Sequence, residues 1–268
     1  MSDTKNSEWV RSCPIEELET YLEGKERRDL PMPIQQALYD RLQAAAGETK
    51  TPYVIPLFRV RTWNETGQVK HDSGLKPSYS STRNWWNHMV MFLDQRPPRN
   101  SGAASTYWGD GYVNFRYQDG KMRRGSAVYT KDDAEVNFGF SGRGISQSCG
   151  VIPGFGTTAE AFSNYVLASM IGHGACNNAL FYYTTIMTNT YYSATNPWRV
   201  MTYKRFFRND GTAITIREAG ALYRPQYGVV TGLLMFRDIL TTPVSLVNGD
   251  WMELQYAFKL NYPAGVGA

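Results

Sequence analysis

The residue types best suited to bind a metal lie in the middle of the chain. Cys149 is followed later by His173 and Cys176 in the order His-Gly-Ala-Cys. A structural zinc site needs four ligands, usually supplied by paired Cys-x₂-Cys units, so one ligand is missing unless His71 or His88 supplies it. Buried thiols and a loop histidine explain these residues more simply. We therefore predict no metal and no cofactor.

Acidic and serine residues offer two further kinds of chemistry. Asp132, Asp133 and Glu135 could be read as the two carboxylates that glycoside hydrolysis places across a scissile bond. Neighbouring acids on a turn are, however, far more often simply solvated. Ser146-Gln-Ser148-Cys149 lacks the Gly-x-Ser-x-Gly pattern that presents a nucleophilic serine. The sequence therefore predicts no catalytic residues and a protein that is not an enzyme.

Two charged pairs stand in segments expected to be strands. Arg217 precedes Glu218 near the end of one segment, and Arg237 precedes Asp238 in another. An ion pair between the two strands would fix their register and would stabilise the sheet by about 0.2–1 kcal/mol. We interpret these four residues as structural.

Aromatic residues gather in one expected strand and the loop that follows it. Core packing accounts for alternate members of this group. The remaining ones face outward and are possible contacts for a partner subunit or a sugar, because Tyr offers a large apolar face with a polar tip and little rotamer freedom to lose. These possible contacts are Tyr183, Tyr191, Tyr192 and Trp198.

The composition favours β structure for the elements that position these residues. Only 19 % of the 268 residues are charged, whereas 14 % are aromatic and 24 residues are Gly. Strands favour aromatic side chains and tight turns need Gly. The length suffices for one large β domain or two ordinary domains.

Charge, cysteine count and hydropathy exclude several classes of protein. The net charge of +4 is mild and no long basic run is present, so binding to nucleic acid is not expected. Three cysteines are too few for a disulfide framework. The start of the chain shows no secretory signal, and no apolar run reaches the length of a membrane span. We therefore expect synthesis in a reducing cytoplasm and no contact with a membrane.

The first 50 residues predict a helical hairpin. Pro14 fits the first turn of one helix and Pro33 the first turn of the next, because a missing N–H costs nothing there. Helices this short are marginal in water on their own. The hairpin must therefore pack either on its own β domain or on a neighbouring subunit. The residues assigned to subunit docking are Ile15, Leu18 and Leu22 on the first helix and Ile34, Leu38 and Leu42 on the second.

Beyond residue 50 the pattern becomes that of strands. Tyr53–Trp63 predicts a strand, and Arg83–Leu93 predicts a short helix or buried strand within a long excursion over residues 71–110. Thr157 and Glu160 have the spacing of a capping box, which predicts one helix at about 157–171. Further strands are predicted at Leu180–Thr190, Arg199–Arg208, Thr212–Arg217, Gly228–Leu240, Val244–Val247 and Trp251–Leu260.

The predicted fold is mainly β, an antiparallel β-sandwich of jelly-roll or Ig-like type. It carries the N-terminal helical hairpin and the one short helix. The predicted regions are a helical docking segment over residues 1–50, a β-rich region with a long loop excursion over 51–150, and a C-terminal β-sandwich over 151–268.

Several motifs in the last 115 or so residues resemble virion structural proteins of tailed bacteriophages. They are Pro153-Gly154-Phe-Gly156 leading to Tyr165, Ile214-Thr-Ile-Arg-Glu-Ala-Gly220, Phe236-Arg-Asp-Ile-Leu-Thr-Thr-Pro243-Val, and Val247-Asn-Gly-Asp250 before a long alternating strand. The chain departs from the pattern at Ala219-Gly-Ala221, where an extra residue before Leu222 predicts a bulge.

The resemblance implies a particle component present in many copies and without chemistry of its own. We therefore expect a homo-oligomer that contacts other virion proteins and resides in the virion, at the neck, the tail or the capsid surface. The alternative is a receptor-binding or glycan-binding fibre module that uses the Tyr and Trp loops.

Overall fold

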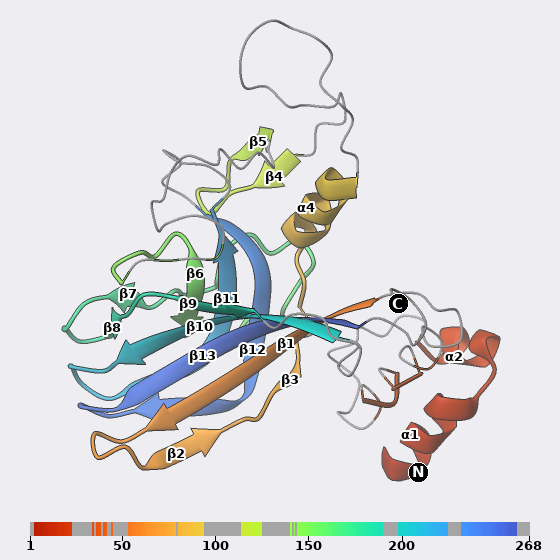
Figure 1. The fold of residues 1–268 in the computed structure, drawn as a ribbon, viewed down its shortest axis with the longest axis horizontal. Coiled ribbons are helices and arrows are strands. Elements are labelled where there is room, and N and C mark those ends of the chain that lie inside the picture. Colours follow the sequence, from red (N-terminus) through yellow and green to blue (C-terminus); the bar gives the residue numbers. More distant parts are fainter. Residues whose placement is uncertain are drawn as a thin grey trace, which may run out of the picture. The chain divides into compact units, whose positions relative to one another are not determined.

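The computed structural model describes residues 3–22, 34, 36–38, 40–41, 44, 53–78, 80–93, 114–124, 140, 142, 144–189, 198–224 and 232–261 (Figure 1). Helices α1, α2 and α4 span Asp3–Ser12, Ile15–Leu22 and Arg83–Leu93. The strands are β1 (Tyr53–Trp63), β2 (Val69–Asp72), β3 (Lys76–Pro77), β4 (Asn114–Arg116), β5 (Met122–Arg124), β6 (Gly150–Gly154), β7 (Gly172–His173), β8 (Ala179–Tyr182), β9 (Ile186–Asn189), β10 (Trp198–Arg208), β11 (Ile214–Tyr223), β12 (Leu233–Leu246) and β13 (Trp251–Asn261).

Most strands belong to two sheets, so the fold is mainly β as predicted. The larger sheet has the order β2-β1-β13-β10-β8-β7, with β3 beside β1 and β9 beside β10. The smaller sheet has the order β12-β11-β6, and β4 and β5 form a separate hairpin (Figure 1). Because β7 and β8 pair in parallel, the larger sheet is mixed and not wholly antiparallel. The jelly-roll or Ig-like type stays a prediction.

Strand β13 shows how the two sheets share a core. Its inward side chains Met252, Leu254 and Tyr256 are fully buried. The Tyr256 ring lies 5.9 Å from the ring of Phe236 on β12, and the Tyr256 hydroxyl donates to a carboxylate oxygen of Asp238 at 2.6 Å. Burial, reinforced by the Asp238 charge, raises the pKa of Tyr256 well above its ordinary value. The alternating pattern of β13 thus buries one side of the larger sheet against the smaller one.

Strand β12 (Leu233–Leu246) is continuous where the sequence predicted two strands, Gly228–Leu240 and Val244–Val247. It continues across Pro243, which is tolerated because β12 is the outer strand of the smaller sheet. The register of β11 against β12 shifts between Ala221 and Leu222, which confirms the bulge predicted there. The predicted strand Leu180–Thr190 is instead two short strands, β8 and β9.

The helix predicted at about 157–171 is wrong, because this segment is irregular. Several of its polar backbone groups are paired with side chains of β11 and β12. Glu160, expected to cap the helix, accepts the backbone N–H of Ile239 on β12. A helix forms only when its backbone groups pair internally, and here tertiary partners replaced that pairing.

The chain divides into two compact units. Unit 1 comprises Met1–Ile55, Asn189–Val200 and Phe258–Ala268, and unit 2 comprises Pro56–Thr188 and Met201–Ala257. Unit 2 therefore includes residues on both sides of position 150, where the sequence suggested a boundary. No helix in the described part of the chain is long and apolar enough to span a membrane.

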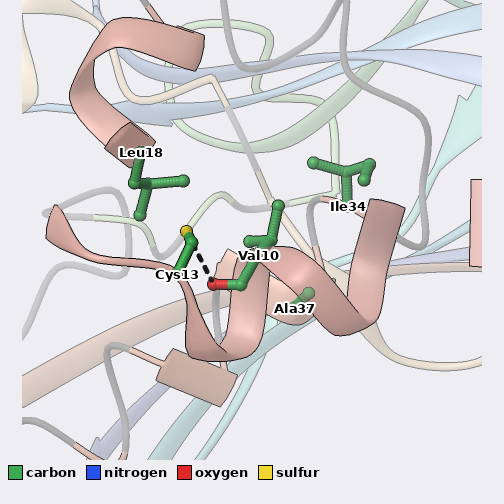
Figure 2. Packing of buried hydrophobic residues seen from close by; sticks show 5 residues of the cluster. All are labelled: Val10, Cys13, Leu18, Ile34 and Ala37. Carbon is green, nitrogen blue, oxygen red and sulfur yellow. Dashed lines mark hydrogen bonds between the residues drawn. The ribbon is translucent and has the colours of Figure 1, made fainter. Parts of the chain in front are cut away.

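Unit 1 contains a small helical core of its own (Figure 2). The buried members are Val10, Cys13, Leu18, Ile34 and Ala37, and Figure 2 shows Cys13 Sγ directed at the carbonyl oxygen of Val10. Arg41 donates to this same carbonyl at 3.1 Å, which satisfies a group left unpaired at the end of α1. Helix α1, which the sequence did not predict, thus completes the core.

Candidate functional site

The outer side of the larger sheet carries rings and cations where a solvated face would carry small polar residues. On β10, Arg205 and Phe207 are buried, whereas Lys204, Phe206 and Arg208 are half-buried on the other side. The alternation of a strand forces this division, since successive side chains point to opposite faces. We name this surface the aromatic–cation face. Its members are Arg61, Trp63, Phe181, Tyr183, Lys204, Phe206, Arg208 and Trp251.

The rings of the aromatic–cation face pair across intervening strands. Trp63 on β1 lies 6.2 Å from Phe206 on β10, although β13 runs between those strands. Tyr183, just after β8, lies 5.1 Å from Trp251 on β13, although β10 runs between them. The rings therefore lean over the strand between them and form a partial second layer.

Each pair of rings is accompanied by cations. The guanidinium carbons of Arg61 and Arg208 lie 5.0 Å and 5.7 Å from the ring centres of Trp63 and Trp251, and Lys204 Nζ lies 5.8 Å from that of Phe206. Each such contact stabilises the arrangement by about 0.5–1 kcal/mol at an exposed site. The cations thereby hold the rings in fixed orientations.

Carboxylates at the rim anchor the arginines. Asp210 Oδ1 lies 2.9 Å from Arg208 Nε in an ion pair. Asp72 Oδ2 lies 3.6 Å from Arg61 Nε and 2.5 Å from Arg59 Nη2. The hydrogen bond from Arg59 is the main cause that lowers the pKa of Asp72 to about 2. Asp72 is therefore ionised at neutral pH and keeps both arginines in place.

The aromatic–cation face can bind a partner by stacking and charge. Trp, Tyr and Arg are the residues that most often dominate the energy of protein interfaces. Trp and Tyr bury much area while losing little freedom, and the planar guanidinium of Arg donates several hydrogen bonds and stacks on rings. The rings are already ordered against one another, so a partner would lose less entropy in binding.

The structure places the predicted contact residues unequally. Tyr183 belongs to the aromatic–cation face, and Trp198 begins β10 although its side chain is not described. Tyr191 and Tyr192 lie outside the described residues, as do Asp132, Asp133 and Glu135. Trp63, Phe206 and Trp251 were missed. The alternation of Lys204, Phe206 and Arg208 along one strand was the available signal.

Glu218 and Arg237 form a buried ion pair between β11 and β12 of unit 2. Of the four charged residues that the sequence analysis interpreted as structural, these two form the cross-strand pair. Arg237 Nε donates to Glu218 Oε2 at 2.8 Å, and both side chains are almost completely buried. The other predicted members differ in surroundings. Arg217 is exposed, and Asp238 accepts the hydroxyl groups of Ser78 and Tyr256.

This buried pair holds the irregular segment 155–169 against the smaller sheet. Glu218 accepts backbone N–H groups of Gly156, Ala168 and Ser169 at 2.8–3.2 Å. Arg237 donates to the carbonyls of Thr158 and Ala159 at 2.9 and 3.2 Å. Three of the four motifs that resemble phage proteins are therefore parts of one hydrogen-bonded network, namely those that contain Gly156, Glu218 and Arg237, and this network is structural in character.

The docking residues predicted from the sequence lie in unit 1. Leu18 and Ile34 are buried in its core and Leu38 packs against it. Ile15 and Leu22 belong to α2, but their side chains are not described, and Leu42 lies outside the described residues. Leu18 and Ile34 are therefore occupied within their own unit.

Cys149, His173 and Cys176, which the sequence analysis weighed as zinc ligands, have different surroundings. Cys149 is buried beside Ser146, His173 accepts the backbone N–H of Tyr182 through Nδ1, and Cys176 is exposed. Among the described residues, no group of three or more His, Cys, Asp or Glu side chains could hold a metal ion.

Comparison of the chain with protein-family models, with curated proteins and with solved structures found no match.

Proposed function

We propose that this chain is a non-catalytic structural subunit of a bacteriophage particle and that it acts through contacts between subunits. The observation that carries the proposal is the aromatic–cation face, whose Trp, Tyr and Arg side chains are those that anchor protein interfaces. The motifs resembling virion proteins support it, since three of them build the buried hydrogen-bonded network around Glu218 and Arg237. Neck, tail and capsid surface are all compatible with such a subunit.

The proposal is tested by mass spectrometry of phage particles purified from cultures that produce the chain. We expect the chain at a fixed ratio to the other particle proteins. Trp251→Ala should lower that ratio, because it removes the ring that lies 5.1 Å from Tyr183 on the aromatic–cation face. Met122→Ala, which changes an exposed apolar residue on β5, is the matched control and should leave incorporation unchanged. A chain absent from purified particles would contradict the proposal.

The stacked pair of Tyr183 and Trp251 favours a second candidate, a receptor-binding or glycan-binding module. Sugar rings stack on aromatic faces of this kind. A glycan array separates the two candidates, because a purely structural subunit gives no signal. Binding to one glycan that Trp251→Ala abolishes and Met122→Ala preserves would favour the second.

A further inference from the structure

The first 50 residues and the rest of the chain have net charges of opposite sign. Residues 1–50 contain ten acidic and seven basic side chains, a net charge of −3, whereas residues 51–268 contain fourteen acidic and twenty-one basic ones, a net charge of +7. Such an asymmetry favours contact between the N-terminal segment of one molecule and the remainder of another.

Within the N-terminal segment the acidic residues concentrate on α2. Its eight residues include Glu16, Glu17 and Glu19 and no basic residue. Leu18 is buried in the core of unit 1, while Glu17 and Thr20 are exposed. Helix α2 therefore packs Leu18 within its own unit and leaves the Glu17 side chain exposed.

The aromatic–cation face has the complementary charge. Arg59 and Arg61 share the carboxylate of Asp72, and the carboxylate of Glu253 also attracts Arg59. Arg208 is matched by Asp210, and Lys204 adds a further half-exposed cation beside Phe206. The rings supply apolar area. Among the described groups named here, four cations face three carboxylates, and this excess supplies attraction for an acidic helix.

We propose that α2 of one copy of this chain docks on the aromatic–cation face of a second copy, so that Glu17 approaches Lys204. The proposal deepens the proposed function, on which it rests, by naming the partner as another copy. The contact joins two different surfaces. It therefore either closes reciprocally into a twofold dimer or repeats head-to-tail into a ring or a filament. Repeated subunits of a particle are joined in this manner.

Single charge-reversal substitutions in the full-length chain test the contact. Self-association is measured by analytical ultracentrifugation over a concentration series. We expect self-association that weakens as salt is added, because salt screens partly exposed charges. Glu17→Lys and Lys204→Glu should each weaken association by about tenfold or more, since like charges then face each other. The two substitutions together should restore association toward that of the wild type.

Lys121→Glu is the matched control, because it makes the same charge change at an exposed site beside the β4–β5 turn. It should leave association unchanged. A double variant as weak as the single ones, an equal effect of Lys121→Glu, a monomer at every concentration, or binding of an anionic polysaccharide without self-association would each overturn the contact. A chain that is monomeric yet present in particles refutes only this contact. A self-associating chain absent from particles refutes only the proposed function.

Discussion

At the scale of single residues, the Glu218–Arg237 pair shows why a buried charge is costly to lose. Both groups have left water, and the penalty is offset only while each keeps its partner and its backbone hydrogen bonds. The sequence predicted an ion pair that stabilises the sheet by only about 0.2–1 kcal/mol, as an exposed pair does. Burial instead makes removal of either partner severe, because the remaining charge stays behind in the core.

We therefore expect Arg237→Ala to lower the free energy of unfolding by about 3–5 kcal/mol. Arg217→Ala, at an exposed position on the neighbouring strand, should change it by less than about 0.5 kcal/mol. Urea denaturation followed by tryptophan fluorescence measures both. Similar losses for the two variants would show that the pair does not hold segment 155–169.

His88 on α4 gives a pH dependence of stability with a definite sign. Burial lowers the pKa of His88 from 6.5 to about 4. The unfolded chain then binds the proton more readily than the folded one, so stability is present above pH 6.5 and is lost as the pH falls toward 4. The loss attributable to this residue is about 3 kcal/mol.

His88→Phe should flatten this decline, because Phe keeps the ring contacts with Tyr223 and Phe115 but does not titrate. The measurement is the free energy of unfolding at several pH values across that window. An equally steep decline in the variant would assign the dependence to other groups.

At the scale of elements, the sequence predicted those strands whose alternation is uninterrupted. Bounds close to those of β1, β10 and β13 could be read from the pattern because one face of each is buried. The structure of segment 157–171 could not be read from the pattern. Its residues Thr157 and Glu160 have the spacing of a capping box, although the segment forms no helix. What decided the outcome was Glu218 and Arg237, which lie more than forty residues later in the chain.

Gly156 tests how tightly segment 155–169 fits that pair. A Cβ atom at Gly156 would lie 2.3 Å from Glu218 Oε1 and 2.5 Å from the Cβ of Ala168. Gly156→Ala should therefore destabilise the fold by about 1–3 kcal/mol or more through overpacking. Gly172→Ala is the matched control, since a Cβ there would meet nothing within 4 Å. Thermal unfolding that ranks Gly172→Ala as the more damaging change would contradict this packing.

At the scale of the whole molecule, the aromatic–cation face lies beyond prediction from sequence patterns. Trp63 and Phe206 become neighbours only because β1 and β10 are placed on either side of β13. Unit 1 is likewise assembled from three separate stretches of chain. Local periodicity indicates which side of a strand is buried, but the strand order decides which outward side chains meet.

Deletion of residues 1–50 tests whether unit 2 folds without them and whether they are needed for self-association. Unit 2 contains the core between the two sheets and the buried Glu218–Arg237 pair, so we expect the shortened chain to keep a cooperative thermal transition and a β-type circular dichroism spectrum. It should also lose self-association, because α2 is gone while the aromatic–cation face remains. Full-length Glu17→Lys is the companion variant, since it changes charge without removing any chain. A shortened chain that folds and still self-associates would mean that the molecules bind one another through surfaces other than α2. The N-terminal segment would then have no part in assembly.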